Sequence, residues 1–557
     1  MDKNNNRQSA VFNTVLRSDE KMAKMHIEKE RKVIPIIFLP GVMGSNLKAK
    51  SETGKNQNTK KIWCLDSAAS MANWFFMGAK ARKIKLKPDR TEVDFRGKIS
   101  DASEAEIQLF GDRRERGWGS ISYLGYGEFL KIFQSYLYQP NGQLSSKLTN
   151  LINDLPFVLD EGSKEQLIFK ENEIEICKNY DFPLYAMGYN WLESNAESAE
   201  KLKTLVEETI PKFYKKRGRV CDKVILITHS MGGLVARFYT ELLGGRDKVY
   251  GVINGVQPST GAAAAYTRMK RGNEDDWIMA NILGKDAAEM TAVCAQAPGP
   301  LQLLPSGEYR AKSLTSEKYV PEWLTITTPD GKSESFPKTN PYDDIYLNKE
   351  QWWCACEPHL INPLNTRYDK TTMQKDWQEY EKLICIQVKS FHEKIADKFH
   401  PNTYVFFGIE ESGNTIREEL LTYERVHWQG KFIDSSSIFA ERPPKNYIGD
   451  NNRLNLKELN EDRTLKANAN ESKDDNIASL KKRSIKIKYT LKEANDDGDS
   501  TVPKSSGEIP IEKIQVRMHI PVKHGSPYDE DICQEFALRA IVAIIQKVNK
   551  NEQQAKT

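Results

Sequence analysis

The chain has 557 residues, and its 81 lysines and arginines nearly balance its 77 aspartates and glutamates, which leaves a net charge of +4. This balance argues against a nucleic-acid-binding protein, and no apolar run approaches the roughly 20 residues that a transmembrane helix needs. The length is sufficient for several domains, or for one large core with long insertions.

The first 32 residues are polar and charged, and they contain no apolar stretch of the signal-peptide type. We therefore expect a polar N-terminal extension over residues 1–32. We also expect a protein that is made in the cytoplasm without a signal peptide and that leaves, if it is secreted, by a signal-independent route.

Short apolar runs bounded by turn residues predict the strands of the fold. The runs at 33–39, 224–228 and 403–407 are continuous rather than alternating, as in strands that are buried on both faces of a parallel sheet. Amphipathic helical patterns lie between them, for example over residues 196–214. This alternation predicts an α/β fold. The predicted strands are 33–39, 184–187, 224–228, 249–253, 403–407 and, as an alternating run, 485–491.

Three stretches interrupt this pattern. Residues 65–116 include an aromatic cluster at 74–76 with basic residues after it, which indicates either a cap with an interfacial surface or plain internal packing. Residues 260–400 form a longer insertion that contains five tryptophans. Residues 445–482 are rich in Asn, Asp and Lys and predict a polar surface loop. The members of the aromatic and basic group are Trp74, Phe75, Phe76, Lys80, Arg82, Lys83 and Lys85.

The eight cysteines show no repeated short spacing, which argues against a disulfide framework. Cys354 and Cys356 lie close to His359 in the sequence, but two thiols one residue apart do not easily share a tetrahedral metal site. We therefore predict a buried cluster of thiols and aromatic rings around Trp352 and Trp353, and we expect no metal ion.

The segment 223–237, KVILITHSMGGLVAR, carries the strongest functional signal. A predicted strand runs through a sharp turn into a predicted helix, which is the context of a nucleophile elbow with Ser230 as the nucleophile. Thr228 stands where a glycine is usual. An ordinary N-cap serine would explain Ser230 but neither Gly232 nor Gly233, so the catalytic interpretation is favoured.

A serine hydroxyl is a weak nucleophile until a histidine takes its proton and an acid orients that histidine. The turn sequence 495–503, NDDGDSTVP, supplies the acid, for which we predict Asp499 over its neighbours Asp496 and Asp497. An aspartate in such a turn also has an ordinary structural role.

Two of the eight histidines, His519 and His524, follow the predicted acid. His519 lies in a predicted strand, whereas His524 lies in a glycine-containing loop before a predicted helix at 529–548. We therefore predict His524 as the catalytic base.

Acyl chemistry also needs backbone N–H groups that stabilise an oxyanion. In a nucleophile elbow, the residue after the serine gives one donor, here Met231. The turn at 39–45, directly after the first buried strand, would give the second donor from Val42, with Met43 as the alternative.

Taken together, these motifs resemble those of the lecithin:cholesterol acyltransferase and lysosomal phospholipase A2 group. The resemblance implies an α/β-hydrolase fold with a cap and a lid over the acyl site, and activity on phospholipid esters. The family's nucleophile, acid, base and oxyanion donors then fall on Ser230, Asp499, His524, Val42 and Met231. The matching segments are 38–50, 62–64, 188–191, 228–232 and 497–503.

A second resemblance concerns residues 255–266 together with Arg268. This segment is similar to bacterial lipase effectors of type VI secretion systems, in the branch related to GPI inositol-deacylase. It implies a secreted antibacterial lipase that acts at the periplasm or membrane of a target cell, with a secretion carrier and a cognate immunity or inhibitor protein.

The sequence therefore predicts an α/β-hydrolase fold, with a mostly parallel central sheet flanked by helices and large cap or lid insertions. The first part of the core would span 33–260, with a cap insertion at about 65–116; a cap or lid would span 261–400; the second part of the core would span 401–557. The predicted function is hydrolysis of phospholipid acyl esters, without a cofactor and without nucleic acid as a partner. Acyl transfer, hydrolysis of small esters and a non-catalytic binding role remain alternatives.

Overall fold

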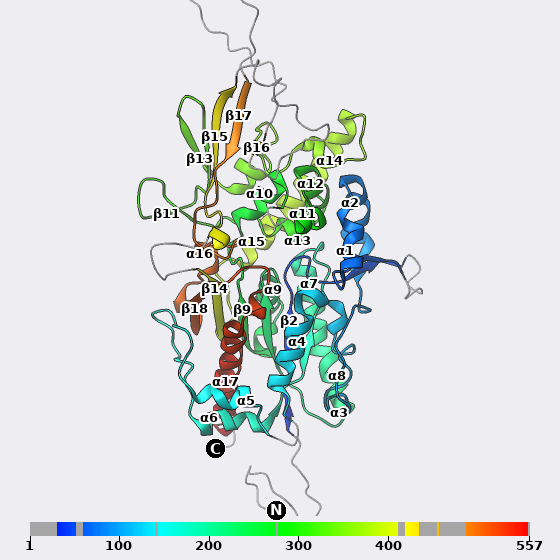
Figure 1. Ribbon diagram of the computed structural model, residues 1–557, viewed down its shortest axis with the longest axis vertical. Coiled ribbons are helices and arrows are strands. Elements are labelled where there is room, and N and C mark those ends of the chain that lie inside the picture. The colour runs from blue at the N-terminus through cyan, green and yellow to red at the C-terminus, as the bar shows by residue number, and fades with distance from the viewer. Residues whose placement is uncertain are drawn as a thin grey trace, which may run out of the picture.

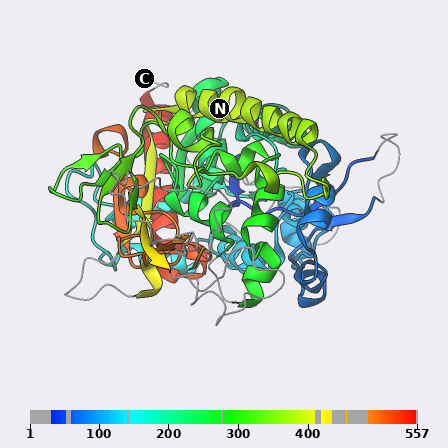
Figure 2. The ribbon, with the colours of Figure 1, turned by 90° about the horizontal axis from the view of Figure 1, so that it is seen from above.

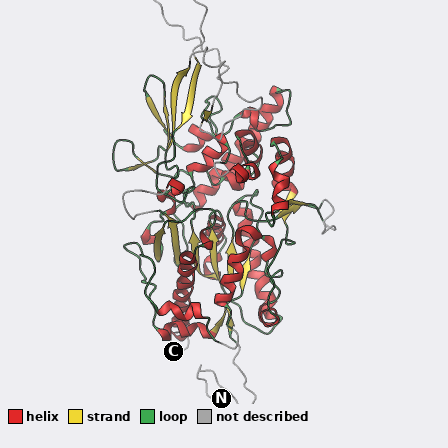
Figure 3. Cartoon of the chain, in the orientation of Figure 1, coloured by secondary structure: helices red, strands yellow, loops and turns green. Residues whose placement is uncertain are grey.

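The computed structural model describes residues 31–51, 59–139, 143–273, 277–409, 418–433, 454–455 and 486–554. A sheet between helices fills the lower half of the molecule in Figure 1, and a mainly helical region with a second sheet lies above it (Figure 3). Almost all of the expected N-terminal extension and of the polar loop at 445–482 lies outside the described residues.

Six parallel strands form the central sheet, in the order β18-β14-β9-β8-β2-β7. Five of the six predicted runs contribute a strand to this sheet, so the prediction of an α/β fold with a mostly parallel sheet is confirmed. The strands are β2 (Ile36–Leu39), β7 (Leu184–Ala186), β8 (Val224–His229), β9 (Val249–Gly255), β14 (Thr403–Gly408) and β18 (Val516–Ile520).

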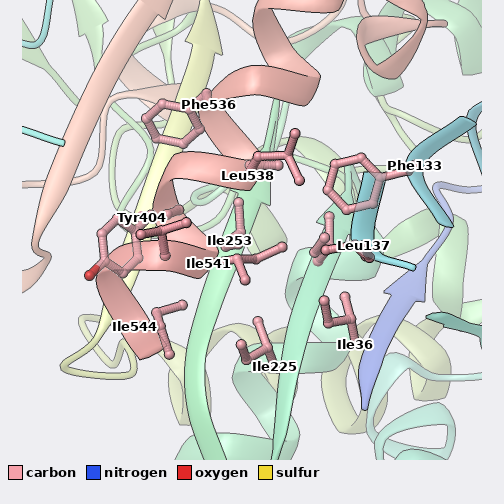
Figure 4. Packing of buried hydrophobic residues seen from close by; sticks show 14 of the residues in the cluster. Ile36, Phe133, Leu137, Ile225, Ile253, Tyr404, Phe536, Leu538, Ile541 and Ile544 are labelled. Atoms are coloured by element: carbon pink, nitrogen blue, oxygen red, sulfur yellow. The ribbon is translucent and has the colours of Figure 1, made fainter. Parts of the chain in front are cut away.

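Both faces of the central sheet are buried. Successive side chains of each strand point to opposite faces, and every residue of β2 is buried. Ile36 and Phe38 pack with α4 (Tyr123–Leu137) and α17 (Asp531–Gln554). Figure 4 shows side chains of these two helices meeting those of the strands. Full burial of one such aliphatic side chain stabilises the fold by roughly 1.5–3 kcal/mol.

The opposite face of the sheet is covered by the predicted helix at 196–214 and by the helix after β8. The first is continuous but contains a π-helical turn, Leu205–Thr209, between α7 (Asn195–Thr204) and α8 (Ile210–Lys215). The second is α9 (Gly232–Leu242). Leu202, Val206 and Ile210 pack from this side in one buried cluster with Ile37 and Leu226 of the strands.

A long insertion between β9 and β14 builds most of the upper region. Its helices are α10 (Ala263–Arg271), α11 (Trp277–Leu283), α12 (Ala287–Cys294), α13 (Pro298–Leu301), α14 (Lys370–Lys382) and α15 (Ser390–Ile395). A π-helical segment, Leu383–Lys389, joins α14 to α15. Together they form the long yellow-green helix that crosses the top of Figure 2.

The second sheet has the order β13-β12-β15-β17-β16. It joins β12 (Leu324–Thr327) and β13 (Ser333–Phe336) of the insertion to β15 (Val426–Ile433), β16 (Leu454–Asn455) and β17 (Lys486–Leu491). The sequence prediction assigns residues 401–557, which include the last three strands, to the second part of the core. The alternating run predicted at 485–491 is β17, and it pairs antiparallel with β15 rather than within the central sheet.

The segment after β2 adds a smaller part of the upper region, with β3 (Leu47–Ala49), β4 (Lys61–Trp63) and β5 (Thr91–Val93) in a three-stranded sheet. Its helices α1 (Ala68–Phe75) and α2 (Ala79–Lys85) pack on α11 and α12. The remaining elements are β1 (Lys32–Val33), β6 (Tyr180–Asp181), β10 (Ala311–Lys312), β11 (Tyr319–Val320), α3 (Glu104–Phe110), α5 (Ser146–Thr149), α6 (Glu171–Glu175) and α16 (Lys504–Gly507).

The interfacial interpretation of residues 74–85 is wrong for two of its members. Trp74 and Arg82 are each only 1% exposed. The Trp74 ring lies 5.1 Å from that of Trp63, and the Arg82 guanidinium donates to the backbone carbonyls of Asn281 and Ile282. These contacts fix α1 and α2 to α11. Phe76, in contrast, is 84% exposed.

The thiols of Cys354 and Cys356 are buried, as predicted. Cys354 Sγ donates to the Cys356 carbonyl at 3.1 Å, and Cys356 belongs to the same buried cluster as Trp352. None of the helices among the described residues combines the length and apolar composition that a membrane span requires.

His392 of α15 is buried and connects two other segments of the insertion by hydrogen bonds. Its Nε2–H donates to the Gln302 carbonyl, and its Nδ1 accepts from the Tyr342 hydroxyl, each at 2.9 Å. One donating and one accepting nitrogen are the pattern of a neutral imidazole. Burial lowers the pKa of His392 from 6.5 to about 4.

We predict that protonation of His392 destabilises the fold in acid. Below pH 6.5 the unfolded chain binds a proton that the folded protein excludes, so the free energy of unfolding falls as the pH drops toward 4. A glutamine at this position keeps the donor to Gln302 but does not titrate. Between pH 6.5 and pH 5, urea unfolding should show a loss about 1.5 kcal/mol smaller in His392→Gln than in the parent. Equal losses in the two proteins would contradict this account.

Candidate active site

The turn that holds Ser230 lies between β8 and α9. Ser230 has a φ of 52°, a left-handed conformation that non-glycine residues rarely adopt. Its N–H donates to the Gly255 carbonyl, and its own carbonyl accepts from Gly233 N–H, both at 3.0 Å. Because neighbouring backbone fixes both sides of the residue, the strained turn is held at the carboxyl edge of the sheet.

Gly232 allows the turn to lie directly against the loop that follows β2. A Cβ atom at this position would lie 2.6 Å from the Leu39 carbonyl oxygen and 2.7 Å from that of Pro40. These are backbone atoms, which do not move aside as a flexible side chain would. The glycine is therefore required by the close approach of the two loops.

Thr228, which replaces the usual glycine, is fully buried at the end of β8. Its Oγ1 donates to Asn254 Oδ1 on the neighbouring strand β9 at 2.7 Å, and its carbonyl accepts from the Tyr528 hydroxyl at 2.9 Å. The extra hydroxyl is therefore hydrogen-bonded rather than left unsatisfied, so the substitution fits the turn.

Three predicted residues from distant parts of the chain meet at this turn. His524 Nε2 lies 2.8 Å from Ser230 Oγ, and His524 Nδ1 lies 2.8 Å from Asp499 Oδ2. When Nδ1–H donates to the carboxylate, Nε2 is left as an acceptor for the serine hydroxyl. The arrangement can therefore carry a proton away from Ser230 Oγ.

Asp499 is itself firmly held. Its Oδ1 accepts backbone N–H groups from Thr501 at 3.0 Å and Val502 at 2.6 Å, and its carbonyl accepts from His524 N–H at 2.8 Å. The side chain is 1% exposed. Such bonds fix the carboxylate so that its other oxygen faces the imidazole.

The alternative residues have different partners. Asp496 Oδ2 accepts the backbone N–H groups of Glu424 and Arg425. His519, on the edge strand β18, lies with its Nδ1 2.5 Å from Asp160 Oδ1. Neither residue is bonded to Ser230.

The loop after β2 carries the predicted second oxyanion donor. Among the described residues, no hydrogen bond is made by the backbone N–H of Val42, Met43 or Met231. Aromatic side chains hold the loop on both sides of Val42: the Tyr189 hydroxyl donates to the Pro40 carbonyl at 2.7 Å, and Trp63 Nε1–H to the Met43 carbonyl at 2.8 Å. The loop therefore keeps free N–H groups in a fixed position.

The start of the insertion lies close to the segment that carries the acid. Ser230 is only 3% exposed. Arg268 of α10 donates to the Thr501 hydroxyl at 2.9 Å, and Thr260 N–H donates to Ser506 Oγ at 3.1 Å. These bonds join the start of the insertion to the segment that follows Asp499.

Two residues at the site are not predicted from the sequence. Tyr126 and His229 are buried beside the turn and hydrogen-bonded to each other. His229 directly precedes Ser230 in the sequence, and this position could have drawn attention to it. Its partner Tyr126 lies in a helical segment without any recognisable motif.

The parallel sheet, the strained serine turn at its carboxyl edge and the covering insertion define an α/β hydrolase. Residues 171–524 match the family model for lecithin:cholesterol acyltransferase, which is more than half of the chain. The chain therefore belongs to the lecithin:cholesterol acyltransferase family. This membership identifies it as an enzyme that acts on lipid acyl esters.

Among solved structures, the chain is similar to a chain of the Tle4–Tli4 complex. The two are 25% identical with a TM-score of 0.69, and the match covers 93% of this chain and 99% of the other. Phospholipase PlaB from Legionella pneumophila matches at 11% identity over 46% of this chain and 65% of its own. Its TM-score of 0.14 is too low to carry an argument. No curated protein matches the sequence.

We predict that Gly232→Ala destabilises the protein by about 1–3 kcal/mol, since the added methyl group forces the two loops apart. Gly307→Ala is the matched control, because a Cβ there meets no atom within 4 Å. Urea unfolding should show a lower midpoint for Gly232→Ala alone. Equal midpoints would mean that the loops separate without cost.

Proposed function

We propose that this protein hydrolyses acyl esters of phospholipids with Ser230 as nucleophile, His524 as general base and Asp499 as the acid that orients it. The observation that carries the proposal is the unbroken hydrogen-bonded series from Asp499 through His524 to Ser230 Oγ. The lipid-ester family to which the chain belongs supports the substrate class.

In this mechanism Ser230 Oγ attacks the ester carbonyl while His524 Nε2 takes the hydroxyl proton. The N–H groups of Val42 and Met231 stabilise the negative oxygen that develops. His524 then gives the proton to the departing lysophospholipid oxygen, which leaves an acyl group on Ser230. Water repeats the sequence: His524 takes its proton, the carbonyl is attacked, and the fatty acid leaves as Ser230 regains its proton.

Acyl transfer to an alcohol is the second candidate, because the family is named for an acyltransferase. The two reactions share every step up to the acyl-enzyme and differ in the molecule that then attacks it.

We further propose that the enzyme is an antibacterial effector secreted by a type VI route, with a secretion carrier and a cognate immunity protein. The resemblance of residues 255–266 to such lipases supports this role. The similarity to a chain of the Tle4–Tli4 complex also supports it, because that structure holds two different proteins together.

The central test replaces the nucleophile. Ser230→Ala should lower the rate of phospholipid hydrolysis at least about a thousandfold, because the acyl-enzyme cannot form. A fluorophosphonate probe should label Ser230 in the parent, and Ser135→Ala, which removes an exposed serine of α4, should leave labelling unchanged. Labelling that persists in Ser230→Ala would contradict the assignment.

The substrate class is tested with vesicles of defined phospholipids and with short-chain esters. Lysophospholipid and fatty acid should accumulate from the vesicles and be absent with Ser230→Ala, as measured by mass spectrometry. Turnover of short esters alone would make the protein a small-ester esterase. A transferred acyl group on an added long-chain alcohol, in place of free fatty acid, would make it an acyltransferase.

The effector role predicts toxicity that depends on location. Directed to the periplasm of a susceptible bacterium, the parent should lower viability, whereas Ser230→Ala should not. Coexpression of a neighbouring gene's periplasmic product should restore growth. Normal growth with an active parent enzyme in the periplasm would contradict this role and leave the lipase assignment intact.

A further inference from the structure

We infer that Tyr126 and His229 are a buried pair of positioning residues that sets the catalytic histidine relative to the oxyanion loop. This inference rests on the proposed function. It concerns the geometry of the site, since neither side chain takes part in the proposed chemistry. The pair lies between two segments that must keep a fixed separation, the loop at 40–44 and the loop that carries His524.

Three hydrogen bonds connect these segments. Gly41 N–H donates to the Tyr126 hydroxyl oxygen at 3.1 Å, and that hydroxyl lies 2.7 Å from His229 Nδ1. His229 Nε2 lies 2.7 Å from the backbone carbonyl of His524. The series therefore runs from the backbone of one loop to the backbone of the other through two side chains.

The donor directions are fixed by the chemistry of the groups. A carbonyl oxygen only accepts, so His229 Nε2 must carry a proton that it donates to His524. Burial, with His524 nearby, lowers the pKa of His229 to about 3, so the ring is neutral and its Nδ1 is free to accept. The single proton of the Tyr126 hydroxyl then goes to Nδ1, and its oxygen accepts from Gly41. Every donor in the series is used.

This series completes the anchoring of His524. Its N–H donates to the Asp499 carbonyl, its ring is held by Asp499 and Ser230, and its own carbonyl accepts from His229. At the next residue, Gly525, a Cβ atom would meet nothing within 4 Å, so the chain has open space around it immediately beyond this anchor.

The packing of the loop against the pair is equally close. A Cβ atom at Gly41 would lie 3.0 Å from His229 Nδ1 and 3.1 Å from Ser230 Cβ. The rings of Tyr126 and His229 meet edge to face at 5.7 Å, and the Tyr126 ring lies 5.1 Å from that of Phe38 on β2. Because this packing is close, a shift of one loop displaces the other loop through the pair.

Three substitutions break the series at different points. Tyr126→Phe removes the hydroxyl, His229→Gln keeps a donor toward His524 and loses the acceptor for Tyr126, and His229→Asn does the reverse. Because displacement of catalytic groups by about 1 Å costs up to about a hundredfold in rate, we expect kcat to fall about tenfold to a hundredfold in each variant. KM should stay within about twofold, because neither residue contacts the substrate in the proposed mechanism.

A double-mutant cycle separates positioning from general destabilisation. With one link already broken by His229→Asn, adding Tyr126→Phe should lower kcat by less than it does in the parent. Tyr185→Phe is the matched control: it removes a buried hydroxyl that donates to Tyr214 at 3.3 Å, away from the site, and should leave kcat unchanged.

Fluorophosphonate labelling distinguishes the failure of this inference from that of the proposed function. Slower labelling of Ser230 in folded Tyr126→Phe would support positioning. A parent that is neither labelled nor active would overturn the proposed function. An active parent with unchanged kcat in Tyr126→Phe would overturn the inference alone. Should the His229 variants fail to fold, Tyr126→Phe, which loses a single oxygen atom, decides the question.

Discussion

The close approach of two loops from neighbouring parallel strands is the constraint on which the site depends. The turn after β8 and the loop after β2 lie so near each other that a Cβ atom at Gly232 would clash with the backbone of the other loop, and one at Gly41 would be in tight contact with His229 and Ser230. Parallel pairing of β2 with β8 brings both loops to the same edge of the sheet. This contact places the strained backbone of Ser230 beside the loop of Val42, whose N–H, like that of Met231, makes no hydrogen bond among the described residues. The order of the strands therefore determines that the proposed nucleophile lies next to the loop with the proposed oxyanion donor.

The rest of the molecule is arranged around that edge. Strand β14 ends at the same edge of the sheet. The chain then passes through the second sheet and returns to this edge with the segment of Asp499 and the loop of His524. The insertion after β9 and the strands after 418 share one hydrophobic core, so residues on either side of β14 build a single covering layer. Bonds from this layer, such as that of Arg268 to Thr501, reach the segment that holds the acid.

Much of this could be predicted from the sequence, for identifiable reasons. Strands buried on both faces, such as 224–229, give continuous apolar runs, and the order of serine, acid and histidine limits the choice among candidates. The second sheet was not predictable, because Leu324 of β12 pairs with Val426 across a long stretch of chain. The burial of Arg82 depends on carbonyl groups about two hundred residues away. His229 was visible beside Ser230, but its partner Tyr126 belongs to an ordinary amphipathic helix, and only the folded structure shows that they meet.

The central claim is that Ser230 carries the acyl group during turnover. The most direct measurement is to mix the protein with phospholipid, quench with acid within the first turnover and analyse its peptides by mass spectrometry. The account predicts that the peptide containing Ser230 gains the mass of one fatty acyl group, and that this adduct disappears as free fatty acid forms. An acyl group on another residue, or fatty acid release without any acylated peptide, would contradict it.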